Sequence, residues 1–211
     1  RNEAALFSLV ILSEALQEFG DVVLFGSAYL FVAPEDPDRG QIMARVQAAE
    51  KKMVQSGRLQ VKAQPADAEI TLDGVPVGRG ALALNLPAGR SFALRASAPD
   101  FVPWEEQVRL EAGEERTLAH RLDKIIYKGT LTARVIPDGA VDVYVDTRKV
   151  GTDTMKLTLT EGRRLVCFKK EGWDRWWRYV DVPRNGSTDL DVQLEQTTEM
   201  DGPCDVWPTE D

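Results

Sequence analysis

The chain contains one stretch of sequence twice. The first copy runs from residue 58 to residue 122, and the second from residue 129 to residue 194. Apolar, proline, glycine and aspartate positions match in the same order in both copies, with two one-residue slips in the alignment. Each copy is therefore expected to fold as the same unit. Matched pairs include Leu59 and Leu131, Pro65 and Pro137, Asp73 and Asp146, Gly89 and Gly162, and Trp104 and Trp176.

Both copies alternate apolar and polar residues with a period of two, as in the run from Leu82 to Leu86. This period is typical of strands that bury one face. Turn signals separate the runs, among them Asp73-Gly74, a dipeptide that favours a tight hairpin. We expect each copy to form a small antiparallel β-sandwich. Because a domain of this length is marginally stable alone, we expect the two copies to dock through the link 123–128.

The residues before the first copy have a helical pattern instead. Apolar side chains recur every three or four positions over residues 3–19 and again over residues 38–55. The segment 22–33 between them is apolar nearly all round, and we expect a buried helix there. Its small residues, such as Gly26, would let another helix approach closely.

These patterns predict the α+β class, with a helical hairpin and a closing helix followed by two small antiparallel β-sandwich domains. Gly20-Asp21 is expected to end the first helix, and Gly57 is well placed to end the third. The expected segments are a helical segment at 1–56, two sandwiches at 58–122 and 129–194, and an acidic tail at 195–211.

The chain is acidic, with a formal net charge of −8. A protein that neutralises phosphates needs a basic face, so we expect no nucleic-acid partner. The tail has no basic residue, whereas the second copy is locally basic around Arg163 and Arg175. No apolar run reaches the length of a transmembrane helix. The chain begins at Arg1 rather than at a methionine, so we expect a processed chain or a fragment.

A short proline motif recurs at the same place in both copies. The second copy has Pro137-Asp-Gly-Ala140, and the first has Pro65-Ala-Asp-Ala68. Each copy later has an aromatic residue after Gly or Asp, at Phe101 and Trp173, with a tryptophan three positions on. This pattern resembles the PEGA domain, a family named for a Pro-Glu-Gly-Ala motif. The resemblance implies two tandem β-sandwich modules without catalytic residues, in a bacterial envelope or surface protein.

The helical segment has motifs in the order of a helical repeat, at Ala15-Leu16, Gly20-Asp21, Ala28-Tyr29-Leu30 and Ala33-Pro34. They resemble the last tetratricopeptide repeat of an array with its closing helix. The segment is about one turn shorter than the family pattern, and Phe25 stands where a small residue is usual. A single repeat cannot bury its own face. Either further repeats or another protein cover this face, or the three helices cap the β-domain that follows.

No set of residues in the sequence indicates an enzyme. Asp73 and Asp146 follow strands and are expected to begin turns by bonding to the local backbone, rather than to bind calcium. His120 is the single histidine, too few for a zinc site or a nucleophilic triad, and we expect it on a surface or edge strand. We expect no catalytic residue, no metal and no cofactor.

The densest aromatic cluster lies in the second copy. Trp173, Trp177 and Tyr179 are expected to share one strand face, with Arg175 and Arg178 beside them. Aromatic residues with arginine are enriched at protein interfaces. Three uses remain open for this cluster, namely a protein interface, a contact between the two domains, and a platform on which sugars stack.

The two cysteines lie in the second copy and the tail. Cys167 aligns with Leu94, a core position, so a buried thiol is expected there. The alternative is a disulfide between Cys167 and Cys204 in an oxidising compartment, which would fasten the tail with Trp207 packed beside it. The tail is otherwise expected to be solvated, to bind a basic partner, or to fold back on the second copy.

Taken together, these features predict a non-catalytic protein that binds other proteins or acts as a scaffold in a bacterial cell envelope, in the periplasm or at the surface. The alternative is a module that binds cell-wall or other polysaccharide through the same tryptophans.

Overall fold

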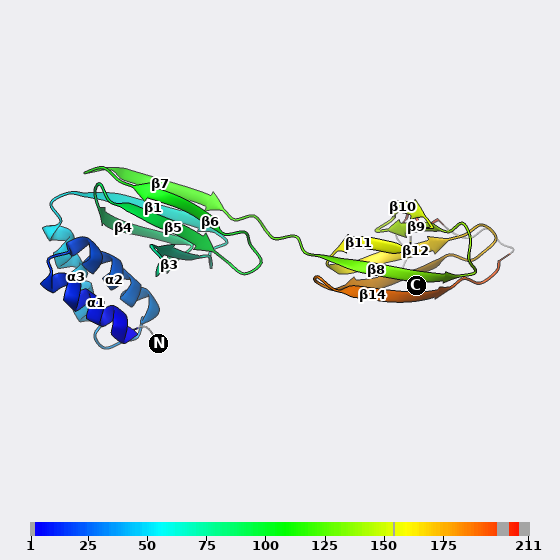
Figure 1. The fold of residues 1–211 in the computed structure, drawn as a ribbon, viewed down its shortest axis with the longest axis horizontal. Helices are drawn as coiled ribbons and strands as arrows, with labels where there is room; N and C mark the ends of the chain where they lie inside the picture. The colour runs from blue at the N-terminus through cyan, green and yellow to red at the C-terminus, as the bar shows by residue number, and fades with distance from the viewer. Residues whose placement is uncertain (1–2, 154, 198–202, 207–211) are drawn as a thin grey trace. The chain divides into compact units, whose positions relative to one another are not determined.

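The structure, a computed structural model, describes residues 3–153, 155–197 and 203–206. The chain divides into two compact units, Arg1–Ile125 and Ile126–Asp211. Within the described residues, the first unit holds three helices and one β-sandwich, and the second holds another β-sandwich (Figure 1). The predicted α+β class is confirmed. None of the helices in this part of the chain has the length and hydropathy of a membrane span.

Three helices open the first unit, as the helical periodicity predicts. The buried helix expected over residues 22–33 is confirmed, and Gly26 lies against Val46 of the neighbouring helix, where a larger side chain would collide. The third helix is shorter than its stripe predicts, because the strand that follows begins at Ser56. The helices are α1 (Glu3–Ala15), α2 (Phe19–Val32) and α3 (Arg39–Lys52).

Both predicted helix-ending glycines have other roles. Gly20 lies in the first turn of α2, and the chain turns earlier, at Gln17, which has a positive φ of 61°. Gly57 lies inside the first strand, where an added Cβ would stand 2.8 Å from the Cβ of Leu110 and 2.9 Å from the carbonyl of Glu111. Gly57 is therefore required for close approach between two chain segments rather than for a helix end.

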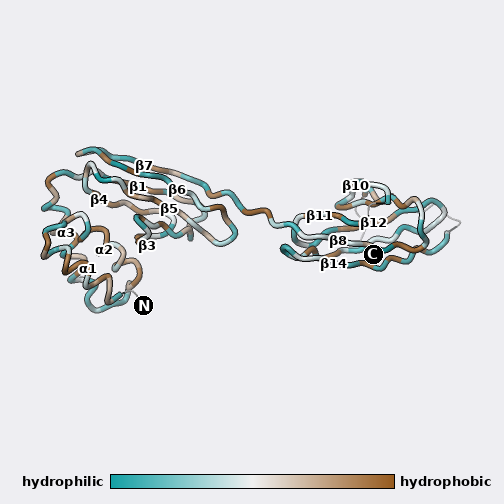
Figure 2. The backbone as a smooth tube through the Cα atoms, viewed as in Figure 1, coloured by the Kyte–Doolittle hydropathy of each residue, from teal (hydrophilic) through white to brown (hydrophobic). Residues whose placement is uncertain are grey.

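The first sandwich has two sheets, with strand orders β4-β1-β7 and β3-β2-β5-β6. Apolar side chains such as Phe92 and Leu94 fill the space between them. Hydropathy alternates along these strands in Figure 2, as the period of two requires. The strands are β1 (Ser56–Gln64), β2 (Glu69–Leu72), β3 (Val75–Arg79), β4 (Ala81–Pro87), β5 (Ser91–Ser97), β6 (Trp104–Arg109) and β7 (Glu115–Arg121).

The helices pack against this first sandwich. α2 lies against β3 and β4, and its Leu24 belongs to the apolar core of the sandwich. Arg90 joins the two layers, because its guanidinium lies 2.5 Å from Asp21 of α2 and 3.4 Å from Asp73 in the β2–β3 turn. The helices therefore cap the β-domain, which is one of the two arrangements expected from the sequence.

The second sandwich repeats the strand plan of the first. Its sheets have the orders β11-β8-β14 and β10-β9-β12-β13, which match the first sandwich strand for strand. The short strands β3 and β10 escape the sequence pattern because they complete tight hairpins. The strands are β8 (Lys128–Ile136), β9 (Asp142–Val145), β10 (Arg148–Thr152), β11 (Lys156–Thr160), β12 (Gly162–Lys169), β13 (Trp176–Val182) and β14 (Ser187–Gln193).

The sequence predicts wholly antiparallel sandwiches, and this prediction is wrong for one strand pair in each. In each, the last strand runs parallel to the first, as β7 does beside β1 and β14 beside β8. The chain reaches this position by crossing from one sheet to the other. Periodicity predicts which face of a strand is buried, but it carries no information on the direction of the neighbouring strand.

Candidate interaction surface on the second sandwich

Strand β13 presents different side chains to its two sides. Trp176 and Val180 face the core of the second sandwich. Trp177 and Tyr179 face the other way, because successive side chains of a strand alternate. Their ring centroids lie 6.5 Å apart and the ring planes meet at 89°. Two of the aromatic residues singled out in the sequence are therefore brought together on the surface of the four-stranded sheet.

The neighbouring strands complete this surface. Leu165 of β12 pairs with Tyr179, and Cys167 pairs with both Trp177 and Tyr144 of β9. Directly paired residues of antiparallel strands point to the same side. Leu165 and Cys167 are only 3% and 4% exposed although they face away from the core. We call this surface the second outer face, and define it by Tyr144, Arg163, Leu165, Cys167, Trp177 and Tyr179.

Positive charge lies directly over the aromatic rings. The guanidinium of Arg163 stands 4.3 Å from the ring centroid of Tyr179, within the range of a cation–π contact. At the far side of the sheet, Lys149 lies 2.7 Å from Asp142, and this hydrogen bond lowers the pKa of the Asp142 carboxyl. Tyr179 is 37% exposed, so the rim of this surface is open to solvent.

The tail is fastened to the second outer face. A disulfide joins Cys167 to Cys204, with their Cα atoms 5.9 Å apart. Arg175 donates a hydrogen bond to the carbonyl of Pro203. Upstream, the backbone N–H of Asp174 donates to the carbonyl of Glu195 at 2.7 Å. The described tail residues, 195–197 and 203–206, thus contact the second copy. Trp207, expected beside the disulfide, lies outside the described residues.

Cys167 faces outward because the alignment slip between the copies occurs earlier than expected. Leu94 pairs with Glu106 of β6, and the residue in the same place of the second sandwich is Val166, which pairs with Arg178. Cys167 therefore corresponds to Arg95 rather than to Leu94. The expectation of a core thiol is wrong for this reason, and the outward position lets the sulfur meet the tail.

The other proposed site residues lie elsewhere. Trp173 is outside β13 and packs on the core of the second sandwich, with the ammonium of Lys170 5.9 Å from its ring. Arg178 lies on the core side of β13, with its guanidinium 5.5 Å from the ring of Trp176. The structure therefore does not bring Trp173 and Arg178 together with Trp177 and Tyr179 as one patch, whereas Arg175 contacts the tail segment that is bonded to this face.

Sequence reasoning missed Tyr144, Arg163 and Leu165. A usable signal is present, because residues 165–168 are four consecutive apolar residues, none of them alanine. Such a run is typical of a strand that is buried on both faces. It indicates that some further segment covers the side opposite to the core.

Asp73 and Asp146 lie in turns, as expected from the sequence. Their carboxylates bond to the neighbouring strand of the sheet, β5 or β12, and not to the local backbone that the sequence analysis expected. The Asp73 carboxylate accepts the N–H of Ala93 at 2.8 Å, and the Asp146 carboxylate accepts that of Leu165 at 3.1 Å. His120 is exposed on the edge strand β7 and stacks on Trp104 at 4.6 Å. Among the described residues, no group of three or more His, Cys, Asp or Glu is arranged to hold a metal ion.

Comparisons with solved structures find weak likenesses. The TIE protein of Bacillus anthracis is 17% identical, with a TM-score of 0.38, and the match covers 67% of this chain and 34% of that protein. GBS52, the minor pilin of Streptococcus agalactiae, is 8% identical with a TM-score of 0.28, covering 70% of this chain and 99% of that one. The shaft pilin SpaA of Lactobacillus rhamnosus GG is 10% identical with a TM-score of 0.26, covering 69% and 99%.

The chain thus spans about a third of the Bacillus anthracis protein. No curated protein matches the chain. The family comparison is more specific, since the model of the PEGA domain matches residues 56–126. That span contains the whole first sandwich, from β1 to β7. Residues 56–126 are therefore a PEGA domain.

Proposed function

We propose that the chain is a non-catalytic scaffold or adaptor of a bacterial cell envelope, and that the second outer face binds another protein. The observation that carries the proposal is the pair Trp177 and Tyr179 beside the buried Leu165 and Cys167 on one sheet face. Partly exposed aromatic residues with a neighbouring arginine, here Arg163, are typical of protein interfaces. The second sandwich is in this view a second PEGA-like module, because its strand plan equals that of the first.

A protein partner fits this surface better than a sugar. A sugar stacks on an open, flat ring face, whereas Trp177 and Tyr179 stand perpendicular to each other. One face of Tyr179 already carries the guanidinium of Arg163 at 4.3 Å. These rings together make a stepped, amphipathic surface, and such surfaces suit the irregular side chains of a protein. Binding of cell-wall polysaccharide is the second candidate.

The disulfide supports an extracytoplasmic location. Disulfides persist in oxidising compartments such as the periplasm or the cell surface, and they are rare in reducing cytosol. The Cys167–Cys204 bond joins two side chains that are each 4% exposed, which is the arrangement of a structural bond. A periplasmic or surface location in the envelope follows from this and agrees with the PEGA domain at residues 56–126.

The helical segment contributes a second contact in this proposal. Leu9 and Leu12 of α1 are 36% and 55% exposed, and Leu16, in the turn directly after this helix, is 59% exposed. By contrast, α3 ends in the exposed Lys51 and Lys52, a polar face suited to closing a helical layer. This asymmetry supports the tetratricopeptide-like interpretation, in which α1 receives a neighbouring helix from further repeats or another protein.

The test compares two substitutions on one strand. Trp177→Ala removes the exposed ring, whereas Arg178→Ala changes the next residue, whose side chain lies on the core side of β13. The purified oxidised chain is cross-linked to the envelope proteins of the producing cells and titrated with peptidoglycan fragments. We expect a cross-linked protein that Trp177→Ala loses and Arg178→Ala keeps, with no saturable change of tryptophan fluorescence on adding the fragments.

The opposite pattern contradicts the proposal. A saturable fluorescence change with peptidoglycan that Trp177→Ala abolishes would assign the surface to sugar. Equal cross-linking by the parent chain and both variants would remove the second outer face from the account. Turnover of any envelope substrate would contradict the non-catalytic part of the proposal.

A further inference from the structure

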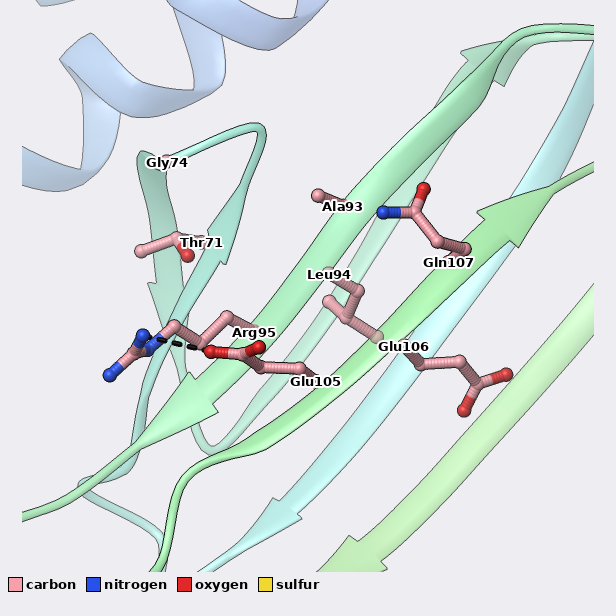
Figure 3. Close-up of a pocket in the computed structure, with 8 residues that line it drawn as sticks. All are labelled: Thr71, Gly74, Ala93, Leu94, Arg95, Glu105, Glu106 and Gln107. Carbon is pink, nitrogen blue, oxygen red and sulfur yellow. Dashed lines mark hydrogen bonds and ion pairs between the residues drawn. The ribbon is translucent and has the colours of Figure 1, made fainter.

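The first sandwich has a groove at the place where the second carries its tail. The groove lies on the outer side of β2, β5 and β6, has a volume of about 390 Å³, and is drawn in Figure 3. Thr71 pairs with Arg95, Ala93 with Gln107, and Arg95 with Glu105, so all five side chains share this side of the sheet. We call this surface the first outer face, and define it by Thr71, Ala93, Arg95, Glu105 and Gln107.

The two outer faces correspond residue for residue through the strand pairing. Leu165 pairs with Tyr179 as Ala93 pairs with Gln107, and Cys167 pairs with Trp177 as Arg95 pairs with Glu105. Every large apolar side chain of the second outer face is thus replaced in the first by a small or polar one. The groove is the space that these side chains would fill. Thr71 pairs with Arg95 as Tyr144 pairs with Cys167, so Thr71 occupies the position that Tyr144 has in the second sandwich.

The second sandwich shows what this side of the sheet accepts. A short segment of chain, Pro203–Val206, is held there by the bond of Cys204 to Cys167 and by the hydrogen bond from Arg175. In the first sandwich, Arg95 occupies the place of the cysteine that anchors this segment. Nothing covalent can attach there, so a segment at this place has to bind reversibly.

The walls of the groove are loosely held and adaptable. The Arg95 guanidinium lies 2.9 Å from the Glu105 carboxylate, but the two side chains are 50% and 65% exposed. A pair so exposed is screened by water and contributes little stability, so an incoming segment can displace it at small cost. Figure 3 shows this pair at one end of the groove, with Gln107 beside Ala93 farther along. The floor formed by Ala93 and Thr71 is small and uncharged.

We infer that the first outer face is a docking site for an extended segment of a partner protein. The partner segment provides a large apolar side chain in the space that Leu165 fills in the second sandwich. The apolar side chain would rest on Ala93 and Thr71, with its backbone bordered by Gln107 and its flanking polar groups paired with Arg95 and Glu105. The segment carries little net charge, because the groove presents both signs. This surface is separate from Trp177, so it stands or falls independently of the proposed function.

The test uses a peptide copied from the chain itself. The probe is the capped hexapeptide of residues 203–208 with Cys204→Ser, which carries one acid and the apolar residues Val206 and Trp207. It is added to the ¹⁵N-labelled oxidised full chain, in which Cys204 is already bonded to Cys167 on the second outer face. We expect backbone amide shifts at Thr71, Ala93, Arg95 and Gln107 that saturate at millimolar peptide.

Matched variants test whether the peptide binds in the groove of the first outer face. Ala93→Leu recreates Leu165 and fills the floor, so we expect binding to weaken at least about tenfold. Gln107→Tyr places a tyrosine at the edge of the groove, in the position that Tyr179 has in the second sandwich. It is also expected to weaken binding of the peptide. Ala83→Leu is the control, since it makes the same change at an exposed position of the three-stranded sheet and should leave binding unchanged.

Three results would overturn the inference. They are the absence of shifts at millimolar peptide, shifts confined to the second unit, and shifts in the first unit that survive both Ala93→Leu and Gln107→Tyr. The amide spectrum of each variant reports directly whether the first sandwich is still folded. Because the two filling variants change different strands, a folding defect in one leaves the other to decide the outcome.

Discussion

The two sandwiches share one strand plan and differ on the same side of the same sheet. On the first, Ala93, Arg95 and Gln107 leave an open polar groove, whereas the second has the larger Leu165 and Tyr179 and the tail fastened at Cys167. The cores are of one kind, built from alternating Val, Leu and Phe. The difference teaches that packing conserves the inward positions of such a duplicated unit, while its outward positions are free to acquire separate contacts.

The largest effect is expected from removing the covalent link of the tail. Cys204→Ser opens a loop that joins residues 37 positions apart, and the second unit should lose about 3 kcal/mol of its free energy of unfolding. Denaturant unfolding followed separately in each unit by amide exchange measures this loss. The first unit should be unaffected, so an equal loss in both units would break the comparison.

A smaller effect is expected at the paired floor positions. Leu165→Ala removes a buried side chain and should destabilise the second unit by about 2 kcal/mol. Ala93→Leu adds the same side chain to an exposed groove and should change the stability of the first unit by less than about 0.5 kcal/mol. Thermal unfolding of both variants tests the contrast. Comparable destabilisation by the two changes would mean that the first outer face is also covered.

A shared feature should act equally in both units. Asp73 and Asp146 each hold the next strand through a carboxylate, so Asp73→Ala and Asp146→Ala should each cost about 1 kcal/mol in their own unit. The asparagine variants keep a carbonyl acceptor and the left-handed backbone, and should cost less. A response in one unit alone would show that the two turns are not equivalent.

The smallest effect is expected at the ion pair between Arg90 and Asp21, which joins the first sandwich to its helices. Arg90 connects α2 to the β2–β3 turn, but its side chain is 42% exposed. Burial lowers the pKa of its guanidinium, but the facing carboxylates outweigh this effect and raise the pKa overall, so the charge persists at all working pH values. Arg90→Ala should therefore lower the free energy of unfolding of the first unit by less than about 1 kcal/mol. This loss should become smaller as salt is added. An effect that salt does not change would contradict the electrostatic explanation.

Much of the fold could be predicted from the sequence because the duplicated alternation is strong. The period of two located most strands, and the apolar segment 22–33 is a helix as expected. The parallel pairing of β1 with β7 could not be predicted, because periodicity says nothing about the direction of neighbours. Helix ends were also wrong, since Gly57 is needed for a close contact with Leu110 that only the folded chain reveals.

Less of the candidate surface could be predicted. Trp177 and Tyr179 were identified from their clustering in the sequence and from strand alternation, but a one-residue error in the slip between the copies placed Cys167 in the core. That error turned its side chain to the wrong face, because a shift of one residue exchanges the two faces of a strand. The disulfide of Cys167 depends on Cys204, 37 positions away in the tail, and no local pattern of the strand reports that partner.

The most direct test of the central claim is a proton NOE spectrum of the oxidised full chain. The account predicts contacts from Cys204 to Cys167 and from Pro203 to Arg175, while Ala93 and Arg95 show contacts to side chains of their own sheet. Absence of the Cys204–Cys167 contact, or of the Pro203–Arg175 contact, would contradict the claim that a segment of the tail is fastened to the second outer face.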